Sequence, residues 1–494
     1  MHATHDLELM LDIKVPIIAV ETQDERRMLE LLTRVTIARA LSDSYQWTVT
    51  RGLRRLAFTG ATPEGGEAMT DPEVLLAHIL KTPGPALYVL CDFHSHMKDA
   101  AKVVRYLKDI ALDFNQLQNT VLLLGHEVPT PREISRLTAT FELALPSDAD
   151  LLGIVREVAQ EWTMRNPAQK VKTDEDTLQA FIANLRGVTH ADARVLVRHA
   201  VFRDGAITES DIPHVNKLKF QLLNAEGPLR LEPNTTDFNA VAGLHNLKRW
   251  LDDRRASVLE AAQIDAPKGI LLLGVQGSGK SLAARAVAGQ WGLPLLRLDF
   301  GTLYDKFVGE TERNVRNALV QAEMMAPCVL WIDEIEKGVA TDQDHAITQR
   351  VLGTLLTWMA ERTASVFIVA TANDVSRLPP ELIRKGRLDE IFFVDLPDQP
   401  SRKAILEVHL QRRGIDPSSV NVDELATLSH GFTGAELEQA VVSARYRVRS
   451  AQPTSHVTDA DLSAAITGTF PISVVMAEQI NALREWASER TVPA

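Results

Sequence analysis

Runs of consecutive apolar residues recur along the chain and are separated by more polar stretches. In the C-terminal half, such runs lie at 269–274, 329–332 and 366–372. Unbroken runs of this length are typical of parallel strands that are buried on both faces of a sheet. Residues 281–288 follow the first run and have the composition of a helix. The pattern predicts buried strands alternating with helices.

The N-terminal half repeats this order of apolar runs. An offset of about 241 to 253 residues relates five pairs of segments, as a worn tandem duplication would leave them. The pairs are 15–20 with the strand at 269–274, 86–92 with 329–333, 120–126 with 367–373, 135–146 with 386–397, and 185–192 with 429–436. The alternative is that unrelated α/β domains share such runs.

This repeat predicts the domain organisation. We expect a degenerate α/β domain at 1–150, a helical lid-like domain at 151–225, a linker at 226–237, a second α/β domain at 238–397 and a C-terminal helical lid at 398–494. A chain of 494 residues is long enough for several such domains.

A glycine-rich octapeptide begins at the end of the run at 269–274. It is Gly274-Val275-Gln276-Gly277-Ser278-Gly279-Lys280-Ser281, with the spacing G-x-x-x-x-G-K-S of a phosphate-binding P-loop. Its three glycines would allow backbone conformations closed to other residues, so that amide hydrogens converge on the β-phosphate at a helix N-terminus. We expect Lys280 to reach the β- and γ-phosphates and the hydroxyl of Ser281 to bind Mg²⁺. The next residue, Leu282, is included in the predicted nucleotide contacts.

Acidic and amide side chains end the next two apolar runs. Asp333 and Glu334 follow the run at 329–332, and Asn373 follows 366–372. We expect Asp333 to hold Mg²⁺, Glu334 to polarise the attacking water and Asn373 to orient that water. The alternative for Asp333 and Glu334 is an acidic helix start after a core strand, which is a weak explanation at this distance from a P-loop.

Seven motifs of this half, in the same order, make the chain resemble the core AAA ATPases. They are 238–248 (FNAVAGLHNLK), 266–269 (APKG), 309–313 (GETER), 326–334 (APCVLWIDE), 370–373 (ATAN), 383–389 (IRKGRLD) and 431–436 (GFTGAE). The resemblance implies a doubly wound parallel α/β domain with a small helical lid and ATP bound between them. It also implies that the backbone near Val241 and Ala242 contacts adenine, and that Gly434 and Ala435 on the lid close over the nucleotide.

The resemblance further implies that Arg384 and Arg387 reach the γ-phosphate of a neighbouring subunit. For any single arginine, a surface salt bridge is the simpler interpretation. An arginine that acts in a neighbour requires a ring, so a homo-oligomer, specifically a hexamer, is implied. The chain departs from the family pattern in the amino-acid sequence of its P-loop and at Ala242, which replaces a glycine. Serine at 281 in place of threonine keeps the hydroxyl that binds the metal.

A closer resemblance covers nearly the whole chain. It is to the AAA proteins called hypothetical chloroplast reading frame forty-six, which are found in cyanobacteria, algal plastids and other bacteria. The segments that carry it are 298–301 (LDFG), 327–337 (PCVLWIDEIEK), 350–353 (RVLG), 383–393 (IRKGRLDEIFF) and 483–487 (LREWA). That family has no firmly assigned substrate, so the resemblance names none.

The N-terminal half lacks the residues that would bind ATP. Opposite the P-loop, residues 21–28 read ETQDERRM, with three acids and no glycine. The acids would repel a triphosphate, and Met28 cannot bind Mg²⁺. Phe93 and His94 follow Asp92, so the glutamate that activates water is absent as well. We predict one ATP site per chain.

Two classes of function could use the hydrolysis of ATP. In AAA rings that remodel proteins, an aromatic residue after the second strand grips a polypeptide in the pore, and Phe307, beside Lys306, occupies the matching position here. This favours a remodeller or unfoldase of a client protein, without a protease, because the motif H-E-x-x-H is absent from the sequence. The alternative is an ATP-gated switch or assembly scaffold that threads nothing. A third class, a DNA-linked role, is poorly supported because the chain is net acidic.

Composition and charge narrow the partners and the compartment. A net charge of −12 argues against nucleic acid as a partner, because phosphate binding needs a basic face. No apolar run approaches about eighteen residues, and the N-terminus does not read as a signal peptide, so we expect no membrane span. Cys91 and Cys328 lie in apolar runs, which suits the reducing cytoplasm, or the stroma of a plastid. His94 and His96 could ligate a metal, but no cysteine or carboxylate cluster supports them in the sequence, and a polar loop is preferred.

Overall fold

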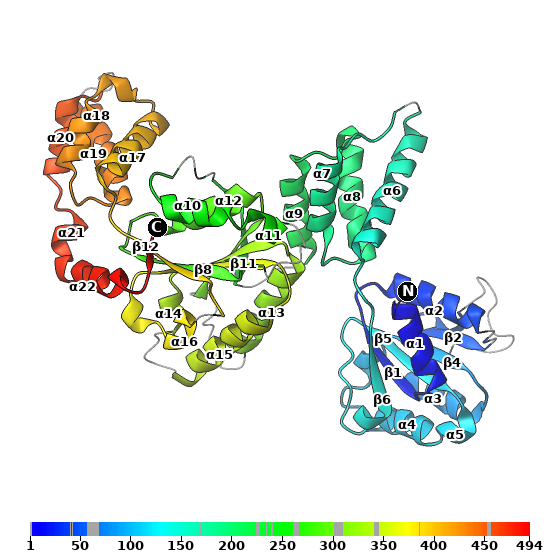
Figure 1. Cartoon of the computed structure of the whole chain (residues 1–494). Coiled ribbons are helices and arrows are strands. Elements are labelled where there is room, and N and C mark those ends of the chain that lie inside the picture. Colours follow the sequence, from blue (N-terminus) through cyan, green and yellow to red (C-terminus); the bar gives the residue numbers. More distant parts are fainter. Residues whose placement is uncertain are drawn as a thin grey trace. The chain divides into compact units, whose positions relative to one another are not determined.

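The computed structural model divides into two compact units (Figure 1). The first unit comprises residues 1–158 and 188–197, and the second comprises 159–187 and 198–494. The structure describes residues 2–39, 41, 43–56, 69–167, 169–223, 228–233, 235–236, 238, 241–259, 266–300, 310–339, 345–384, 386–451 and 456–494.

The first unit contains a six-stranded sheet, called here the N-terminal sheet, in the order β3-β2-β4-β5-β1-β6. Neighbouring strands pair in parallel, except that β2 and β3 are antiparallel. The strands are β1 (Ile17–Glu21), β2 (Ser44–Thr48), β3 (Gly52–Arg55), β4 (Leu87–Cys91), β5 (Thr120–Gly125) and β6 (Thr138–Glu142). The helices are α1 (His2–Asp12), α2 (Glu25–Ala38), α3 (Pro72–Lys81), α4 (Ala101–Leu112) and α5 (Phe114–Leu117).

Helices cover both faces of the N-terminal sheet. Side chains alternate between the two faces along each strand, so each strand contributes to the packing on both sides. Ile17 and Ala19 of β1 join a hydrophobic cluster with residues of α3 and α4. Ile18 and Val20, on the opposite face, join a second cluster with residues of α2. Coverage on both faces explains why the apolar runs in the sequence are unbroken.

Four helices follow: α6 (Asp148–Arg165), α7 (Glu175–Leu185), α8 (His190–Asp204) and α9 (Asp211–Leu222). In the second unit, Lys219 of α9 is fully buried, and its Nζ donates to the carbonyl oxygens of Asn184, at 3.1 Å, and Arg186. A Cβ on Gly187 would lie 2.1 Å from the carbonyl oxygen of Met324, at the end of α13 (Glu310–Met324). The loop after α7 therefore packs directly against the C-terminal α/β domain.

The second unit contains a seven-stranded sheet, called here the C-terminal sheet, in the order β13-β12-β8-β11-β10-β9-β7. All neighbours are parallel except β7 and β9. The strands are β7 (Leu229–Glu232), β8 (Gly269–Gly274), β9 (Leu295–Leu298), β10 (Cys328–Ile332), β11 (Val366–Ala372), β12 (Glu390–Val394) and β13 (Val492–Pro493). The remaining helices of this domain are α10 (His245–Asp252), α11 (Arg255–Leu259), α12 (Lys280–Trp291), α14 (Ile335–Val339), α15 (His345–Glu361) and α16 (Pro380–Ile383).

Figure 1 shows α10 and α12 on one face of the C-terminal sheet and α13 and α15 on the other. Along β8, Ile270 and Leu272 cluster with residues of α12, while Leu271 and Leu273 cluster with residues of α13 and α15. The domain is therefore a doubly wound α/β fold, as the family resemblance implies.

The chain ends in helices and a short strand. These helices are α17 (Gln399–Arg412), α18 (Val422–Leu428), α19 (Gly434–Ala451), α20 (Asp459–Thr467), α21 (Ile472–Val475) and α22 (Ala477–Ser488). Helices α17 to α20 enclose their own hydrophobic core, and β13 then returns to pair with β12 (Figure 1). No single helix in the described part of the chain is long and apolar enough to cross a membrane, while one bent pair, Asp459–Val475 with Ala477–Ser488, passes by length and composition alone.

Five parallel strands have the same spatial order in both sheets. The order β2-β4-β5-β1-β6 in the N-terminal sheet corresponds to β9-β10-β11-β8-β12 in the C-terminal sheet. Within these five strands, β1 lies between β5 and β6, and β8 lies between β11 and β12. The prediction that an AAA-like α/β module precedes the P-loop module is confirmed.

Candidate functional site

The P-loop connects β8 to α12 through residues 275–279. Gly277 and Gly279 have φ angles of +80° and +101°, which residues with a side chain rarely adopt. The expectation is wrong for Gly274, whose backbone is not left-handed. Glycine is needed there because a Cβ would lie 2.1 Å from the carbonyl oxygen of Val394, on the neighbouring strand β12.

Lys280 is buried at the first position of α12. Its Nζ donates to the carbonyl oxygens of Gly274, at 2.9 Å, and Val275, at 2.8 Å. Burial lowers the pKa of Lys280 to about 8, and the nearby carboxylates of Glu336, Asp333 and Glu334 act in the opposite direction. The ammonium is therefore held inside the loop, and it loses its proton more readily than an exposed lysine does.

The other P-loop residues are spread over the rim of the site. Gln276 and Ser281 are exposed, and Leu282 is half-buried. The buried hydroxyl of Ser278 has no hydrogen-bond partner among the described residues. That hydroxyl and the N-terminus of α12 offer hydrogen bonds to an anion.

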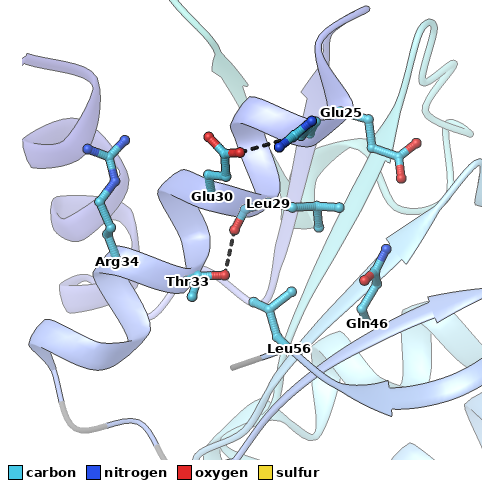
Figure 2. Close-up of a pocket in the computed structure, with 8 residues that line it drawn as sticks. Glu25, Leu29, Glu30, Thr33, Arg34, Gln46 and Leu56 are labelled. Atoms are coloured by element: carbon cyan, nitrogen blue, oxygen red, sulfur yellow. Dashed lines mark hydrogen bonds and ion pairs between the residues drawn. The ribbon is translucent and has the colours of Figure 1, made fainter. Parts of the chain in front are cut away.

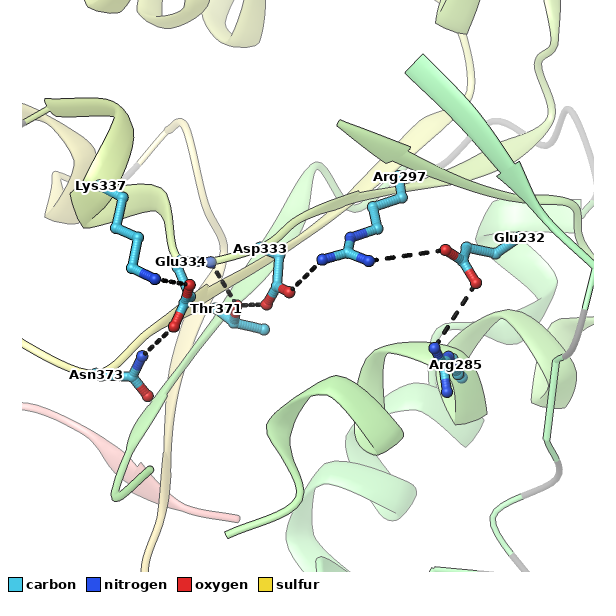
Figure 3. Close-up of polar contacts among 8 residues, drawn as sticks. All are labelled: Glu232, Arg285, Arg297, Asp333, Glu334, Lys337, Thr371 and Asn373. Carbon is cyan, nitrogen blue, oxygen red and sulfur yellow. Dashed lines mark hydrogen bonds and ion pairs between the residues drawn. The ribbon is translucent and has the colours of Figure 1, made fainter. Parts of the chain in front are cut away.

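Asp333 follows β10 and is held by two side chains (Figure 3). Its Oδ1 accepts from the hydroxyl of Thr371 at 2.8 Å, and its Oδ2 accepts from Arg297 at 3.0 Å. Arg297 also approaches Glu232 at 3.9 Å, and Glu232 approaches Arg285 at 3.7 Å. Alternating charges therefore run from Asp333 to the edge strand β7.

Glu334 lies beside Asp333 in a left-handed backbone conformation with φ of +49°. Its Oε1 accepts from Nδ2 of Asn373 at 3.2 Å, and its carboxylate also pairs with Lys337. The hydroxyl of Thr371 accepts from the backbone N–H of Glu334 at 2.9 Å. The structure thus brings the two side chains assigned to the attacking water into direct contact (Figure 3).

Glu336 holds the backbone of Asn373 in place. It is buried, and its Oε1 accepts from the backbone N–H of Asn373 at 2.9 Å. Burial raises the pKa of the Glu336 carboxyl. Sequence reasoning missed Glu336, Thr371 and Arg297, although the position of Thr371, at the end of the strand beside β10, was a usable signal.

The lid touches the P-loop at the residues that the resemblance implies. The backbone N–H of Ala435 lies 3.4 Å from the carbonyl oxygen of Gly277 in a hydrogen bond. A Cβ on Gly434 would stand 3.7 Å from the same oxygen. Thr433 is buried beside them, and a Cβ on Gly277 would lie 3.1 Å from its hydroxyl. The first turn of α19 therefore borders the P-loop.

Val241 and Ala242 lie just before α10. Val241 is buried, and its carbonyl oxygen accepts from Nζ of Lys248 at 3.1 Å. Ala242 is half-buried, and the next residue, Gly243, has a φ of +71° and borders Ser401 of the lid helix α17. This segment is placed between the α/β domain and the lid, where the resemblance puts adenine.

The two arginines lie between α16 and β12. Arg384 is exposed, whereas Arg387 is half-buried and donates to the carbonyl oxygen of Glu381 at 2.6 Å. Nζ of Lys268 donates to the carbonyl oxygen of Gly386 at 3.0 Å, which anchors the loop to the start of β8. Lys306 and Phe307, the expected pore residues, lie outside the described residues.

The corresponding turn of the N-terminal sheet has a different structure. Only residues 22–24 separate β1 from α2, and the carboxylate of Asp24 caps the helix by accepting from the N–H of Arg27 at 3.2 Å. The protein's own carboxylate therefore sits at the helix N-terminus. Figure 2 shows a hollow at the exposed side of α2, and its charged lining includes Arg26 and Glu30, which pair at 3.1 Å.

Comparisons with known proteins agree with the two-module architecture. The family model for the ATPase family associated with various cellular activities (AAA) matches residues 270–396. Models for the N-terminal and second domains of SpoVK-like AAA ATPases match residues 3–143 and 149–226.

Relatives of similar length extend this agreement over the whole chain. The chain is 31% identical to the AAA domain-containing protein ycf46 of Pyropia yezoensis, over 99% of this chain and 98% of the relative. It is 33% identical to ycf46 of Trieres chinensis, over 99% of this chain and 97% of the relative. A stretch of 212 residues is also 34% identical to a cell division cycle protein 48 homolog of Archaeoglobus fulgidus, over 40% of this chain and 28% of the relative.

Proposed function

This chain belongs to the AAA family of ATPases, together with the ycf46 proteins, and we propose that it hydrolyses one ATP per chain and uses the energy to remodel another protein. The contact between Glu334 and Asn373, beside Asp333 and the P-loop lysine, carries the hydrolysis part of this proposal. In it Lys280 binds the β- and γ-phosphates, Glu334 polarises the attacking water, and Asn373 orients that water.

The residues present fit a magnesium ion. Asp333 contributes a carboxylate and Ser281 an exposed hydroxyl, and hard oxygen donors of this kind suit Mg²⁺. The ion would neutralise charge on the β- and γ-phosphates. Arg297 holds one oxygen of Asp333, so it competes with the metal for that carboxylate.

We further propose that the active form is a homo-oligomeric ring, with six subunits. Arg384 is exposed, and Arg387 is anchored to the backbone near the domain surface, so both are available to a neighbour's γ-phosphate. Free and buried Cys91 and Cys328 suit a reducing compartment, the cytoplasm or a plastid stroma.

Two proposals describe how the ring would use the energy of ATP hydrolysis. Threading of a client protein requires Phe307 in the pore, whereas an ATP-gated switch or scaffold does not. Phe307→Ala should abolish remodelling with ATP turnover largely kept under the first proposal and change little under the second. Two quantities are measured for each variant: the rate of ATP turnover, and the unfolding of client proteins that co-purify with the chain in the presence of ATP.

Glu334→Gln tests the reaction itself. We expect turnover to fall by about 10²- to 10⁴-fold, the usual contribution of a positioned base, while ATP stays bound.

Assembly measured by sedimentation with ATP·Mg²⁺ should show an oligomer. Arg387→Ala should lose turnover that wild-type subunits restore in mixed rings. A wild-type protein that stays monomeric with ATP·Mg²⁺ and turns over at full rate contradicts the ring.

A further inference from the structure

The structure gathers three metal-ligating side chains at the carboxyl edge of the N-terminal sheet. Asp92 and His94 follow β4, and His126 follows the neighbouring strand β5. The sequence-based argument against a metal here relied on the lack of a supporting carboxylate. That argument fails, because Asp92 and His126 stand beside His94 in the fold. We propose that Asp92, His94 and His126 bind a divalent transition-metal ion, and Zn²⁺ in particular.

The distances suit one ion. A ligand atom from each of the three side chains lies within 4.8 Å of the others. Three donors around a tetrahedral Zn²⁺, each about 2 Å from the metal, stand roughly 3.3 Å apart. Asp92 and His126 are exposed, so a small rotation of their side chains closes this difference. The rings of His94 and His126 are 5.0 Å apart and nearly perpendicular, at 79°.

His94 supplies an independent sign of a ligand. Its Nδ1 is buried and has no hydrogen-bond partner among the described residues. A buried polar atom without a partner is costly, and a metal bond to this nitrogen would supply the partner and fix the orientation of the ring. The imidazole fits tightly because residue 125 is glycine: a Cβ there would lie 3.0 Å from Nδ1 of His94.

The backbone that carries these residues is fixed. The N–H of Asp92 donates to the carbonyl oxygen of Leu124 at 2.7 Å, and the hydroxyl of Ser95 donates to the carbonyl oxygen of Asp92 at 3.0 Å. The carbonyl oxygen of Gly125 accepts from the N–H of Thr22 at 2.9 Å. The two segments that carry the ligands, one after β4 and one after β5, are therefore tied to each other and to the end of β1, which limits the entropy lost on binding.

The site stands where the C-terminal sheet has its catalytic pair. Asp92 has a left-handed φ of +54°, close to the +49° of Glu334, so its backbone matches Glu334 better than Asp333. His126 follows β5 as Asn373 follows β11. Asp92 and His126 thus stand where the C-terminal sheet has Glu334 and Asn373, and His94 adds a second imidazole.

Imidazole and carboxylate donors favour a zinc-like ion over Mg²⁺, which prefers oxygen ligands. Three protein ligands would leave a fourth position for water. The site needs no nucleotide, so it stands or falls independently of the ATPase proposal.

Zinc titration by calorimetry tests the site. The full chain without a polyhistidine tag, and without nucleotide, should bind one Zn²⁺ that His94→Ala and His126→Ala each weaken by more than about 100-fold. His96→Gln is the matched control, because His96 packs against Trp47 and Phe93 instead and should leave the affinity unchanged. Zinc bound elsewhere is common to all variants and cancels in the difference.

Gly125→Ala provides a test that removes no ligand. Its methyl group should displace His94 and lower the affinity about 10-fold, as expected for residues that orient a ligand. Co²⁺ in place of Zn²⁺ should give the strong visible absorption of a four-coordinate ion, and Asp92→Asn should weaken it. Equal zinc affinity in wild type, His94→Ala and His126→Ala, or a Co²⁺ spectrum unchanged by Gly125→Ala and Asp92→Asn, would overturn the proposal.

Discussion

The two sheets share the order of five parallel strands yet differ in the turn between the first core strand and its helix. In the C-terminal sheet this turn has five residues, 275–279, and two of its glycines are left-handed. In the N-terminal sheet it has three, 22–24, and ends in an aspartate cap. The comparison teaches that strand order depends on the apolar runs, whereas the chemistry depends on a few turn residues.

The shorter turn also changes which residues correspond. Lys280 is the first residue of α12, but Arg27 is the third residue of α2, so an ungapped alignment of 21–28 with 274–281 does not superpose the helices. Arg27 donates to the carbonyl oxygen of Ala144 at 2.7 Å. This hydrogen bond ties α2 to the segment that follows β6.

Lys280→Ala and Arg27→Ala should separate the two turns most clearly. Charged hydrogen bonds are worth about 1.5 to 3 kcal/mol each, and Lys280 is assigned two phosphates, so we expect ATP affinity to fall by about 100-fold or more. Arg27→Ala should leave it unchanged. Equilibrium binding of a fluorescent ATP analogue measures both. Loss of a second bound nucleotide in Arg27→Ala would contradict the single site.

The pH dependence of ATP affinity should be the next largest effect. The pKa of Lys280 is lowered to about 8 by burial, and phosphates beside it would raise that pKa. Affinity should be level below pH 8 and should fall above it, because binding then requires uptake of a proton. The fall is at most about tenfold per pH unit. Lys280→Met should bind weakly but with a flat profile between pH 8 and 9.

Arg297→Ala should change the metal dependence by a smaller factor. Arg297 holds Oδ2 of Asp333, and partly exposed pairs of this kind contribute about 0.2 to 1 kcal/mol. We therefore expect Mg²⁺ to act at concentrations up to about fivefold lower. Arg285→Ala is the control, because Arg285 pairs with Glu232 and not with Asp333. A weaker response to Mg²⁺ in Arg297→Ala would mean that Arg297 orients the carboxylate.

The sequence predicted the elements whose signal is local. The apolar runs identified β1, β4, β5, β8, β10 and β11, because each is buried on both faces. It did not predict that β13 pairs with β12 or that Arg297 reaches Asp333, because these contacts join segments far apart in the chain. Asp92 and His126 were within reach of prediction, since both end neighbouring parallel strands.

The smallest expected effects concern the N-terminal caps of α8 and α19. Ahead of α8, the hydroxyl oxygen of Thr189 accepts from the backbone N–H of Asp192 at 3.1 Å. Ahead of α19, the hydroxyl oxygen of Thr433 accepts from the backbone N–H of Glu436 at 3.2 Å. Each Thr→Ala change should lower the free energy of unfolding by about 0.5 to 2 kcal/mol. Only Thr433→Ala should also raise the KM for ATP, because Thr433 borders the P-loop at Gly277. Thermal unfolding and steady-state turnover measure the two effects, and a raised KM in Thr189→Ala would contradict the assignment of the nucleotide contact to Thr433.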